Sequence, residues 1–372
     1  MDIINTNVLV VGGGVVGLSI AAHLAKEGLE TILIEKNSKL AEEVSARNSG
    51  VIHAGFYYPK GSLKSKLCNY GNKLLYQYCN DNNIYNKKTG KILVAKNQES
   101  LNLFKKYIDN ANSINAEPLK ILEKKEIQKL EPSVVANYGL LSPETGVLDV
   151  HAYITSIENE VVTNGGLISL TTLLKNTKKI GDFFHSIVST GTEEFIIKSN
   201  IVIFSAGLHS RKLKNIDIFN NKNIAKDINF TKGHYFKLSG KSPFTHLVYP
   251  MPTKYGLGIH AGFDVDGSVR FGPDTFLTSK IDYSFEPGVK KTFVDAIKDY
   301  WPDLDEDKLN QDYVGIRPKI QKQGEKFADF SVLGPNEHGI NNCVFLQGIE
   351  SPGLTCSLPI ANYVSSLVKN NF

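Results

Sequence analysis

Three glycines near the start of the chain have the spacing of a dinucleotide-binding turn. Gly12, Gly14 and Gly17 form the pattern GxGxxG between an apolar run at residues 8–11 and a stretch with helical periodicity. Glycines in this setting let the backbone and a helix N-terminus approach a pyrophosphate closely. Glu35 ends a second apolar run, where a carboxylate can accept hydrogen bonds from an adenosine ribose. The predicted nucleotide-binding residues in this segment are Gly12, Gly14, Val15, Val16, Gly17, Glu35 and Lys36.

The glycine pattern by itself does not distinguish FAD from NAD. Two features favour a tightly held FAD. The pattern lies at the very N-terminus, and its sheet is completed by an apolar run at residues 343–346, with antiparallel strands predicted between the two. A colourless purified protein would instead support an NAD-dependent dehydrogenase.

A longer string then resembles a known family. The letters RNSGVIHAGFYY at residues 47–58, followed by GSLK at residues 61–64, are similar to the signature of L-2-hydroxyglutarate dehydrogenases and oxidases, within the D-amino-acid-oxidase-like FAD superfamily. Further similar segments are spread over most of the chain, at residues 90–91, 142–146, 249–252, 258–260, 315–318 and 351–353. The resemblance implies an FAD-dependent oxidation of an L-2-hydroxy acid, with L-2-hydroxyglutarate as the expected substrate and 2-oxoglutarate as product.

The resemblance also assigns residues to the flavin. Asn48, Ser49 and Gly50 are expected on the flavin side of a second FAD-binding segment. Residues 205–207 are expected beneath the dinucleotide, and residues 353–355 at a helix N-terminus whose dipole suits a reduced, negatively charged ring. The predicted cofactor residues outside the glycine turn are Asn48, Ser49, Gly50, Leu174 (near the adenine, where the family has valine), Ala206, Gly207, Gly348, Gly353, Leu354 and Thr355.

Oxidation of a 2-hydroxy acid needs a hydride acceptor above C2, a base for the hydroxyl proton and a cation for the C1 carboxylate. Arg317 matches the superfamily position that binds a substrate carboxylate, and a guanidinium can pair with both oxygens. Histidine suits the base because its ordinary pKa is about 6.5. His53 is the first candidate and His260 the second, and either could instead be a structural histidine.

Other side chains are candidates for the remaining substrate contacts. Tyr249 ranks first among the tyrosines that could hydrogen-bond the substrate, and Tyr58 is a further candidate. The distal carboxylate of a five-carbon diacid needs another donor or cation, for which Lys64 and Arg270 are available. Substrate chain length therefore stays open, and covalent attachment of the flavin is a less favoured alternative.

These residues require an α/β fold (α+β overall) with interleaved domains. Apolar runs predict buried strands at residues 8–11, 31–34, 201–204 and 343–346, short strands at 167–170, 183–189 and 195–198, and a hairpin of 256–263 and 268–272. Helices are predicted at residues 15–26, 62–80, onward as far as 130, at 149–165 and from 355. The expected domains are a Rossmann-like FAD-binding domain of residues 1–85, 140–212 and 328–372 and an antiparallel-sheet substrate domain of residues 86–139 and 213–327.

Composition argues against several other classes of protein. Forty-two Lys+Arg against 38 Asp+Glu give a net charge of +4 without a dense basic stripe, so nucleic acid is not an expected partner. The four cysteines lack CxxC spacing, so we predict neither a metal site nor a disulfide framework. The apolar stretch at residues 7–25 contains the glycine turn, so we expect no membrane span.

Several properties stay open at this point. Oxygen, a quinone and a soluble carrier all accept electrons from reduced flavin without a local motif. We expect a cytoplasmic enzyme, with peripheral contact to the inner membrane face if a quinone is used. Oxidation of an amine or amino acid, as in glycine or sarcosine oxidases, or of glycerol 3-phosphate would keep the same fold. A flavin-binding scaffold or redox sensor without turnover is the alternative of another class.

Overall fold

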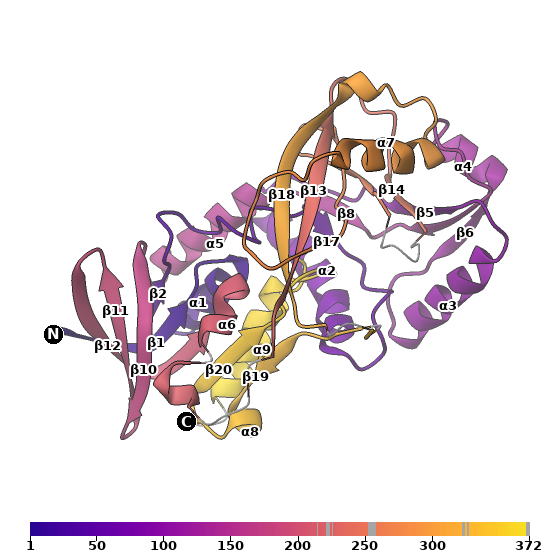
Figure 1. The fold of residues 1–372 in the computed structure, drawn as a ribbon. Helices are drawn as coiled ribbons and strands as arrows, with labels where there is room; N and C mark the ends of the chain where they lie inside the picture. Colours follow the sequence, from indigo (N-terminus) through magenta and orange to yellow (C-terminus); the bar gives the residue numbers. More distant parts are fainter. Residues whose placement is uncertain are drawn as a thin grey trace. The chain divides into compact units, whose positions relative to one another are not determined.

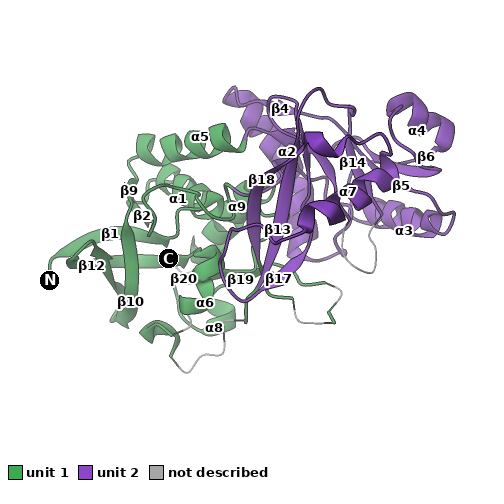
Figure 2. Ribbon diagram, turned by 45° about the horizontal axis from the view of Figure 1, so that its top comes forward, with its two compact units in different colours: residues 1–46, 150–229, 318–372 green, residues 47–149, 230–317 purple. Residues whose placement is uncertain are grey.

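The computed structural model describes residues 1–213, 215–220, 224, 226–251, 258–321, 324–325 and 327–369 (Figure 1). The chain folds into two compact units, each built from separate stretches of sequence (Figure 2). Unit 1 comprises residues 1–46, 150–229 and 318–372, and unit 2 comprises residues 47–149 and 230–317. Both units are therefore discontinuous in sequence, as the interleaved α/β prediction requires.

The unit bounds differ from the predicted domain bounds in four segments. Residues 213–229 and 318–327, expected in the substrate domain, belong to unit 1, and residues 140–149, expected in the FAD-binding domain, belong to unit 2. The longest segment, residues 47–85, is also expected in the FAD-binding domain and belongs to unit 2. Strand β3 in this segment pairs with β8, which also pairs with β4, so the three form one small sheet. The strands of that sheet are β3 (Val51–Ile52), β4 (Asn86–Lys87) and β8 (Gly146–Leu148). Pairing between distant segments thus places residues 47–85 in unit 2, which the local sequence pattern does not indicate.

Unit 1 is built on a sheet that is parallel at its centre (Figure 1). Strand β1 runs parallel to β2 on one side and to β12 on the other, and residues 8–11 are buried. Burial on both faces explains the uninterrupted apolar sequence of this segment. The strands of unit 1 are β1 (Ile3–Val11), β2 (Thr31–Ile34), β9 (Leu167–Ser169), β10 (Thr172–Ile180), β11 (Phe183–Thr190), β12 (Glu193–Phe204), β19 (Ser331–Leu333) and β20 (Cys343–Gln347).

Helices pack on this sheet next to the glycine turn. Helix α1 contacts both α5 and α9, and its apolar side chains, such as Leu18, Ile20 and Leu24, are buried. The helices of unit 1 are α1 (Val15–Lys26), α5 (Val150–Thr163), α6 (Ser210–Leu213), α8 (Pro335–His338) and α9 (Ser357–Lys369), with short 3-10 turns at Gly207–His209 and Asp217–Phe219. The sheet, the glycine turn and the packed helix confirm the Rossmann-like part of the predicted fold.

Unit 2 contains a larger mixed sheet. Strand β14 pairs with β5 in parallel and with β15 in antiparallel orientation, which joins the early and late segments of the unit. Its strands are β5 (Lys91–Ala95), β6 (Lys120–Glu123), β7 (Tyr138–Ser142), β13 (Asn229–Leu238), β14 (Leu247–Pro250), β15 (Ala261–Phe263), β16 (Val269–Phe271), β17 (Phe276–Thr278) and β18 (Leu309–Lys319). Its helices are α2 (Leu63–Asp81), α3 (Ser100–Ser113), α4 (Lys124–Leu130) and α7 (Val289–Tyr300), with a 3-10 turn at Glu306–Lys308.

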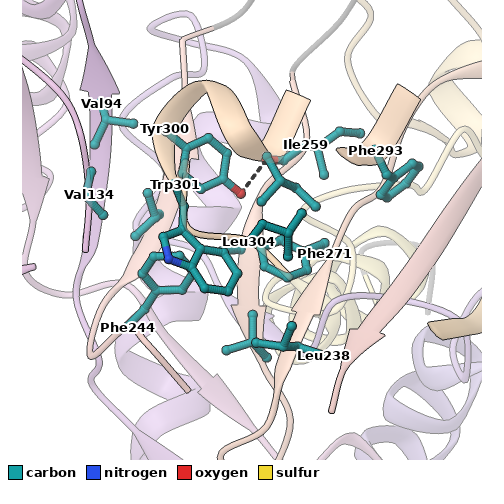
Figure 3. Packing of buried hydrophobic residues seen from close by; sticks show 14 of the residues in the cluster. Val94, Val134, Leu238, Phe244, Ile259, Phe271, Phe293, Tyr300, Trp301 and Leu304 are labelled. Carbon is teal, nitrogen blue, oxygen red and sulfur yellow. Dashed lines mark hydrogen bonds between the residues drawn. The ribbon is translucent and has the colours of Figure 1, made fainter. Parts of the chain in front are cut away.

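One face of this sheet is covered by α7 (Figure 3). Phe293, Ile297 and Tyr300 project from the helix at helical spacing and lie fully buried in an apolar cluster. The Tyr300 hydroxyl donates a hydrogen bond to the carbonyl of Ile259 at 3.1 Å, so the one polar atom of that ring is satisfied. The cluster fixes the strands that precede and follow residues 252–257, which lie outside the described residues.

Several sequence predictions need correction in detail. The predicted helices as far as residue 130 are interrupted by strands β5 and β6. The two strands predicted at residues 195–198 and 201–204 form the single strand β12, and β10 was not predicted. Helix α9 begins at Ser357 rather than at 355. The predicted hairpin is present as β15 and β16, with Gly256 outside the described residues.

Candidate active site

The glycine turn of unit 1 leaves no room for larger side chains. Gly12 has a φ of +109°, and a Cβ there would lie 2.7 Å from the Ser205 carbonyl oxygen. A Cβ at Gly17 would lie 2.0 Å from the Gly12 carbonyl oxygen, so helix α1 can pack this closely on the end of strand β1 only with glycine at position 17. Gly14, at the N-cap of α1, has no side chain that could cover the helix N-terminus. The turn can therefore receive a pyrophosphate against backbone amides.

Glu35 is buried at the end of β2 and faces this turn. Its Oε2 accepts a hydrogen bond from the Gly13 amide at 2.7 Å, and its Oε1 accepts one from the Asn37 amide at 2.8 Å. Each carboxylate oxygen keeps a further lone pair for a ribose hydroxyl. The Lys36 ammonium is paired with Glu43 at 2.7 Å, so its side chain is already engaged within the protein.

The other cofactor residues predicted in unit 1 lie in turns or in the core. The Ser205 hydroxyl donates to the Val11 carbonyl at 3.0 Å, and Ala206 and Gly207 follow directly into a 3-10 turn. Leu174 lies on β10 and packs against the apolar core of the unit. The remaining positions, Gly348, Gly353, Leu354 and Thr355, lie between β20 and α9, and the Gly353 amide donates to the Glu350 carbonyl. Their contacts with a flavin stay predictions.

Residues 47–50 belong to unit 2 and are anchored to its tyrosines. The Asn48 side chain accepts a hydrogen bond from the Gly50 amide at 2.9 Å, which closes a tight turn. The Ser49 hydroxyl bonds the Tyr235 hydroxyl at 3.1 Å, and the Tyr313 hydroxyl donates to the Asn48 carbonyl. The rings of Tyr235 and Tyr313 stack with centroids 4.5 Å apart. These contacts hold the segment that leads into His53.

The backbone of residues 53–58 is clamped by two helices. From α2, the Asn72 side-chain amide donates to the His53 carbonyl at 3.2 Å, and the Cys68 thiol approaches the same oxygen at 3.5 Å. From α3, the Asn110 side-chain amide donates to the carbonyls of residues 56 and 58 at 2.8 and 2.9 Å. Gly55 has a φ of +84° and packs against Cys68. The loop therefore presents His53 from a fixed backbone.

The protein surroundings favour the uncharged form of His53. Burial, the Lys91 charge and His260 together lower the pKa of His53 to about 3. An imidazole with this pKa is unprotonated at neutral pH and can accept a proton, although a low pKa also makes it a weak base. The role of His53 as a base stays a prediction.

His260 and Tyr249 form a stacked pair beside this loop. Strands β14 and β15 pair at Val248 and Ala261, so the residues next to these positions meet on the sheet. The rings of Tyr249 and His260 lie face to face, with centroids 3.6 Å apart and an angle of 8°. Burial, reinforced by Tyr235, raises the pKa of Tyr249, so its hydroxyl keeps its proton and can donate a hydrogen bond.

Lys91 is a buried cation that the sequence analysis did not select. It begins β5, and its Nζ lies over the rings of Phe56, Tyr57 and Tyr249 at 4.7, 4.5 and 5.3 Å from their centroids. Gly90-Lys91 belongs to the resembling segments, and a charged residue at the head of the apolar run KILVA was the available signal. The structure thus brings a lysine together with the predicted histidines and tyrosine.

Arg317 lies near the end of β18, against a loop that carries Asp274 and Thr275. Its Nη2 donates to the Asp274 carbonyl at 2.9 Å and lies 3.4 Å from the Thr275 hydroxyl. Within the described residues no ion pair joins the guanidinium to a carboxylate. Burial raises the pKa of Tyr235, and the Arg317 charge partly opposes that rise. Burial also raises the pKa of Tyr249, with a smaller contribution from Tyr235. An unneutralised guanidinium of this kind can bind a substrate carboxylate.

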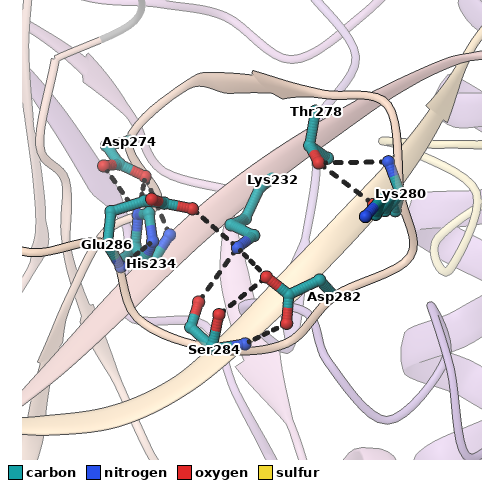
Figure 4. A network of polar contacts seen from close by, with 8 residues as sticks. All are labelled: Lys232, His234, Asp274, Thr278, Lys280, Asp282, Ser284 and Glu286. Carbon is teal, nitrogen blue, oxygen red and sulfur yellow. Dashed lines mark hydrogen bonds and ion pairs between the residues drawn. The ribbon is translucent and has the colours of Figure 1, made fainter.

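A buried polar network holds this loop on β13 (Figure 4). The fully buried His234 ring contacts both carboxylate oxygens of Asp274 through Nδ1, and its Nε2 accepts from the Glu286 amide at 3.3 Å. Because Nε2 accepts, Nδ1 carries the hydrogen that Asp274 receives. Lys232, also buried, pairs with Asp282 at 2.9 Å and with Glu286 at 2.8 Å. The loop that contacts Arg317 is therefore anchored at two points.

The candidates for the distal carboxylate have different environments. Arg270 pairs with Asp264 and Asp312, so its charge is already balanced, and the structure argues against its use as a substrate anchor. Lys64 is buried in the first turn of α2. The Tyr58 carbonyl is held by Asn110, and the residue is half-buried. The substrate roles predicted for Lys64 and Tyr58 stay predictions.

Comparison with known proteins decides the family. The profile of the family described as FAD dependent oxidoreductase matches residues 7–367. L-2-hydroxyglutarate dehydrogenase from Arabidopsis thaliana, named mitochondrial, is 34% identical over 96% of this chain and 82% of its own. The corresponding mitochondrial protein from Dictyostelium discoideum is 30% identical over 98% of this chain and 93% of its own. This chain belongs to the L-2-hydroxyglutarate dehydrogenase family of FAD-dependent oxidoreductases.

Solved structures support the same fold. L-α-glycerophosphate oxidase from Mycoplasma pneumoniae, solved with FAD bound, superposes with a TM-score of 0.88 at 23% identity and covers 98% of this chain and 95% of its own. Glycine oxidase from Geobacillus kaustophilus gives a TM-score of 0.82 at 16% identity, with 99% and 95% covered. The predicted family, fold class and cofactor are therefore confirmed, and the chain is an FAD-dependent oxidoreductase.

The residues of this FAD-dependent oxidoreductase fit their cofactor at the nucleotide end. The glycine turn excludes side chains at positions 12 and 17, where a pyrophosphate would approach the backbone, and the Glu35 carboxylate lies beside the turn with a lone pair left on each oxygen for a ribose hydroxyl. No helix in the described ranges is long and apolar enough to cross a membrane. The four cysteines are unbridged and buried, and the described residues contain no His, Cys, Asp or Glu cluster suited to a metal ion.

Proposed function

We propose that this enzyme oxidises L-2-hydroxyglutarate to 2-oxoglutarate. The names and identities of the relatives support the substrate. One structural observation supports the site assignment: His53, on a loop whose backbone is held by two helices, and a guanidinium without a carboxylate partner among the described residues both belong to unit 2. FAD, when bound, supplies the hydride acceptor at N5.

Three side chains have the remaining roles, which are carboxylate binding, proton acceptance and hydrogen-bond donation. Arg317 pairs with the C1 carboxylate and fixes the orientation of C2. The unprotonated ring nitrogen of His53 takes the proton of the C2 hydroxyl as the C2 hydride leaves, so the C–O single bond becomes the carbonyl of the 2-oxo acid. Tyr249, which keeps its proton, donates a hydrogen bond to a substrate oxygen. The substrate loses one proton and one hydride, which balances the two-electron oxidation.

His260 has a supporting role in this scheme. Its ring lies flat against Tyr249 at 3.6 Å, so it fixes the tyrosine ring through packing. The two candidates for the base can be compared directly in two variants: His53→Ala removes the proposed base, whereas His260→Ala removes a support. We expect slower flavin reduction by a factor of about 10²–10⁴ for His53→Ala and a smaller loss for His260→Ala.

An anaerobic flavin-reduction screen tests the substrate. Purified holoenzyme is mixed without oxygen with L-2-hydroxyglutarate, its D-enantiomer, L-lactate, glycine, sarcosine and glycerol 3-phosphate, and flavin bleaching is followed. We expect rapid bleaching by L-2-hydroxyglutarate. Preference for an amine or for glycerol 3-phosphate would replace the proposed substrate, and a flavin that no donor reduces would support the scaffold alternative.

The reduced enzyme also permits a test of the electron acceptor. After bleaching by the substrate, aliquots are mixed with oxygen, with a water-soluble quinone or with a soluble one-electron carrier, and reoxidation rates are compared. We propose a dehydrogenase that uses an acceptor other than oxygen, as the names of the relatives suggest. Reoxidation by oxygen as fast as by the other acceptors would make the enzyme an oxidase.

A further inference from the structure

Lys91 is a fully buried lysine whose ammonium has no hydrogen-bond acceptor within the described residues. Its Nζ lies over the rings of Phe56, Tyr57 and Tyr249, at 4.7, 4.5 and 5.3 Å from their centroids. Cation–π contacts offset part of the cost of removing the charge from water, but each contributes only about 0.5–2 kcal/mol. The N–H donors of this ammonium are therefore available to a ligand with acceptor oxygens.

Glu117 acts electrostatically on Lys91 but does not occupy its ammonium. The two Glu117 carboxylate oxygens accept hydrogen bonds from the Ser142 hydroxyl and the Glu144 amide. Among the ion pairs of the described residues, none joins Glu117 to Lys91. Burial lowers the pKa of Lys91 to about 8, against the opposing effects of Glu117 and Cys68, so the ammonium is charged at neutral pH.

Strand pairing puts Lys91 on the same face of the sheet as Tyr249 and His260. Leu247 of β14 pairs with Lys91 of β5, and Tyr249 lies two residues further along β14. Paired residues, and every second residue along a strand, point to the same face of a sheet. The Tyr249 ring then stacks on His260 of the sequence just before β15. The buried cation therefore shares its face with the tyrosine proposed to contact the substrate.

This face is not closed to solvent. His53, Tyr57 and His260 are each half-buried, whereas Lys91 is fully buried and touches the ring of Tyr57. A carboxylate that passes the edge of the Tyr57 ring therefore reaches the ammonium. The depth of Lys91 suits the far end of a substrate whose reacting end lies nearer the surface.

We propose that Lys91 binds the distal carboxylate of the substrate and thereby selects a dicarboxylate over a 2-hydroxy acid with a single carboxylate. The inference rests on the proposed function, in which Arg317 pairs with the C1 carboxylate and Tyr249 contacts the substrate. A buried ammonium that gains a carboxylate regains the hydrogen bonds that it lacks in the free protein. An apolar tail in the same place leaves the ammonium unpaired, which disfavours a monocarboxylate.

The other cations considered for this role differ from Lys91. Arg270 already pairs with two carboxylates, those of Asp264 and Asp312. Lys64 is buried in the first turn of α2 and is the remaining rival. The experiment therefore compares the two lysines directly, as Lys91→Met and Lys64→Met.

Anaerobic flavin reduction with two matched acids tests the proposal. L-2-hydroxypentanoate has the same five carbons as L-2-hydroxyglutarate but a methyl group in place of the distal carboxylate. In Lys91→Met we expect the apparent Kd of the diacid to rise about 30- to 1,000-fold. The Kd of the monocarboxylate and the limiting rate of reduction should change less than about threefold, because Arg317 and His53 are retained. Lys66→Met, at an exposed position of α2, is the control and should keep the wild-type constants.

A binding measurement without turnover gives a second readout. Glutarate and pentanoate, which lack the reacting hydroxyl, are titrated into the oxidised holoenzyme, and the flavin absorbance spectrum is followed. Wild type should bind glutarate more tightly than pentanoate, and Lys91→Met should lose this preference. Thermal unfolding of Lys91→Met should be unchanged or raised, because an apolar side chain suits an aromatic cage. If the methionine variant does not fold, Lys91→Gln removes the same charge with a polar side chain.

Three results would overturn the proposal. An equal loss of affinity for both hydroxy acids in Lys91→Met would give the residue a structural role only. Unchanged affinity for the diacid would remove Lys91 from the site. A loss selective for the diacid in Lys64→Met and absent in Lys91→Met would assign the distal carboxylate to Lys64.

The proposed function and this inference fail in different ways. If another donor reduces the wild-type flavin and L-2-hydroxyglutarate does not, the proposed function is wrong, and a preference for glutarate that disappears in Lys91→Met still supports Lys91 as a carboxylate-binding residue. If L-2-hydroxyglutarate reduces the wild-type flavin and Lys91→Met keeps the full preference for the diacid, the proposed function holds and the inference about Lys91 is wrong.

Discussion

The nucleotide turn of unit 1 and the polar cluster of unit 2 solve the problem of positioning in different ways. In unit 1 the decisive contacts are made by backbone atoms, with Gly12 and Gly17 packed closer than any side chain allows. In unit 2 the proposed site consists of side chains, which come from residues 53, 91, 249, 260 and 317. A site built from backbone depends on a few glycines, whereas a site built from side chains depends on the packing beneath each of them.

The largest expected effect comes from a methyl group in unit 1. Gly17→Ala places a Cβ about 2 Å from the Gly12 carbonyl oxygen, which forces α1 away from β1. We expect the purified variant to contain no flavin, as measured by the absorbance of the bound cofactor. Gly28→Ala is the control, because its Cβ meets nothing within 4 Å and only its φ of +85° is strained. Full flavin content in Gly17→Ala would show that the turn adapts more than its packing implies.

In unit 2 the largest effect should follow from loss of the guanidinium. Arg317→Ala removes the proposed carboxylate anchor, and we expect kcat/KM to fall by about 10²- to 10³-fold, mainly through KM, with flavin retained. Arg211→Ala changes the net charge equally at an exposed site of unit 1 and should leave the kinetics unchanged. A wild-type KM in Arg317→Ala would remove this residue from the substrate site.

This difference between the units also explains what the sequence could predict. The nucleotide turn is local: Gly12 to Gly17 and Glu35 lie on adjacent elements whose order is visible as apolar runs and glycines. Lys91 was missed because the rings of its cage come from distant segments: the pairing of β5 with β14 brings Tyr249 near it, and Tyr57 comes from the loop after β3.

The availability of the predicted substrate contacts also depends on tertiary pairing. Arg317 and Arg270 could both be selected as cations, but sequence does not show that Asp264 and Asp312 neutralise the latter. The segment 47–85 was expected in the FAD-binding domain, because the strand pairing that places it in unit 2 connects residues about a hundred positions apart. Patterns of residue type thus identify candidates, and tertiary pairing decides which of them are available.

A smaller effect on kcat/KM is expected from His234, which supports the loop beside Arg317. His234→Phe keeps an aromatic ring on β13 but removes the hydrogen bond to Asp274, whose carbonyl holds Arg317. We expect kcat/KM to fall about tenfold through KM, because a loosened loop positions the guanidinium less well. Lys237→Met, which breaks only partly exposed pairs with Asp264 and Asp266, is the comparison variant and should not change KM. Equal kinetics for wild type and His234→Phe would mean that the loop holds Arg317 without this support.

The smallest effect concerns an ion pair near the nucleotide turn. Burial disfavours ionised Glu43, but hydrogen bonds from His209 and Lys36 outweigh it and lower the pKa of Glu43 to about 2. A carboxyl with a lowered pKa stabilises the fold above its unfolded pKa, near 4.5, and that stabilisation is lost as the pH falls through about 2.

Glu43→Gln should therefore cost about 1 kcal/mol of unfolding free energy at pH 7, because solvent screens this partly exposed group, and the difference from wild type should narrow between pH 5 and pH 3. Urea unfolding of the variant and the wild type at about pH 7, 5 and 3 measures this difference in unfolding free energy. Since the backbone turn does not depend on this pair, flavin content should stay that of the wild type, in contrast to Gly17→Ala. Loss of flavin in Glu43→Gln would show that side chains position the nucleotide site as well, and the distinction between the two units would no longer hold.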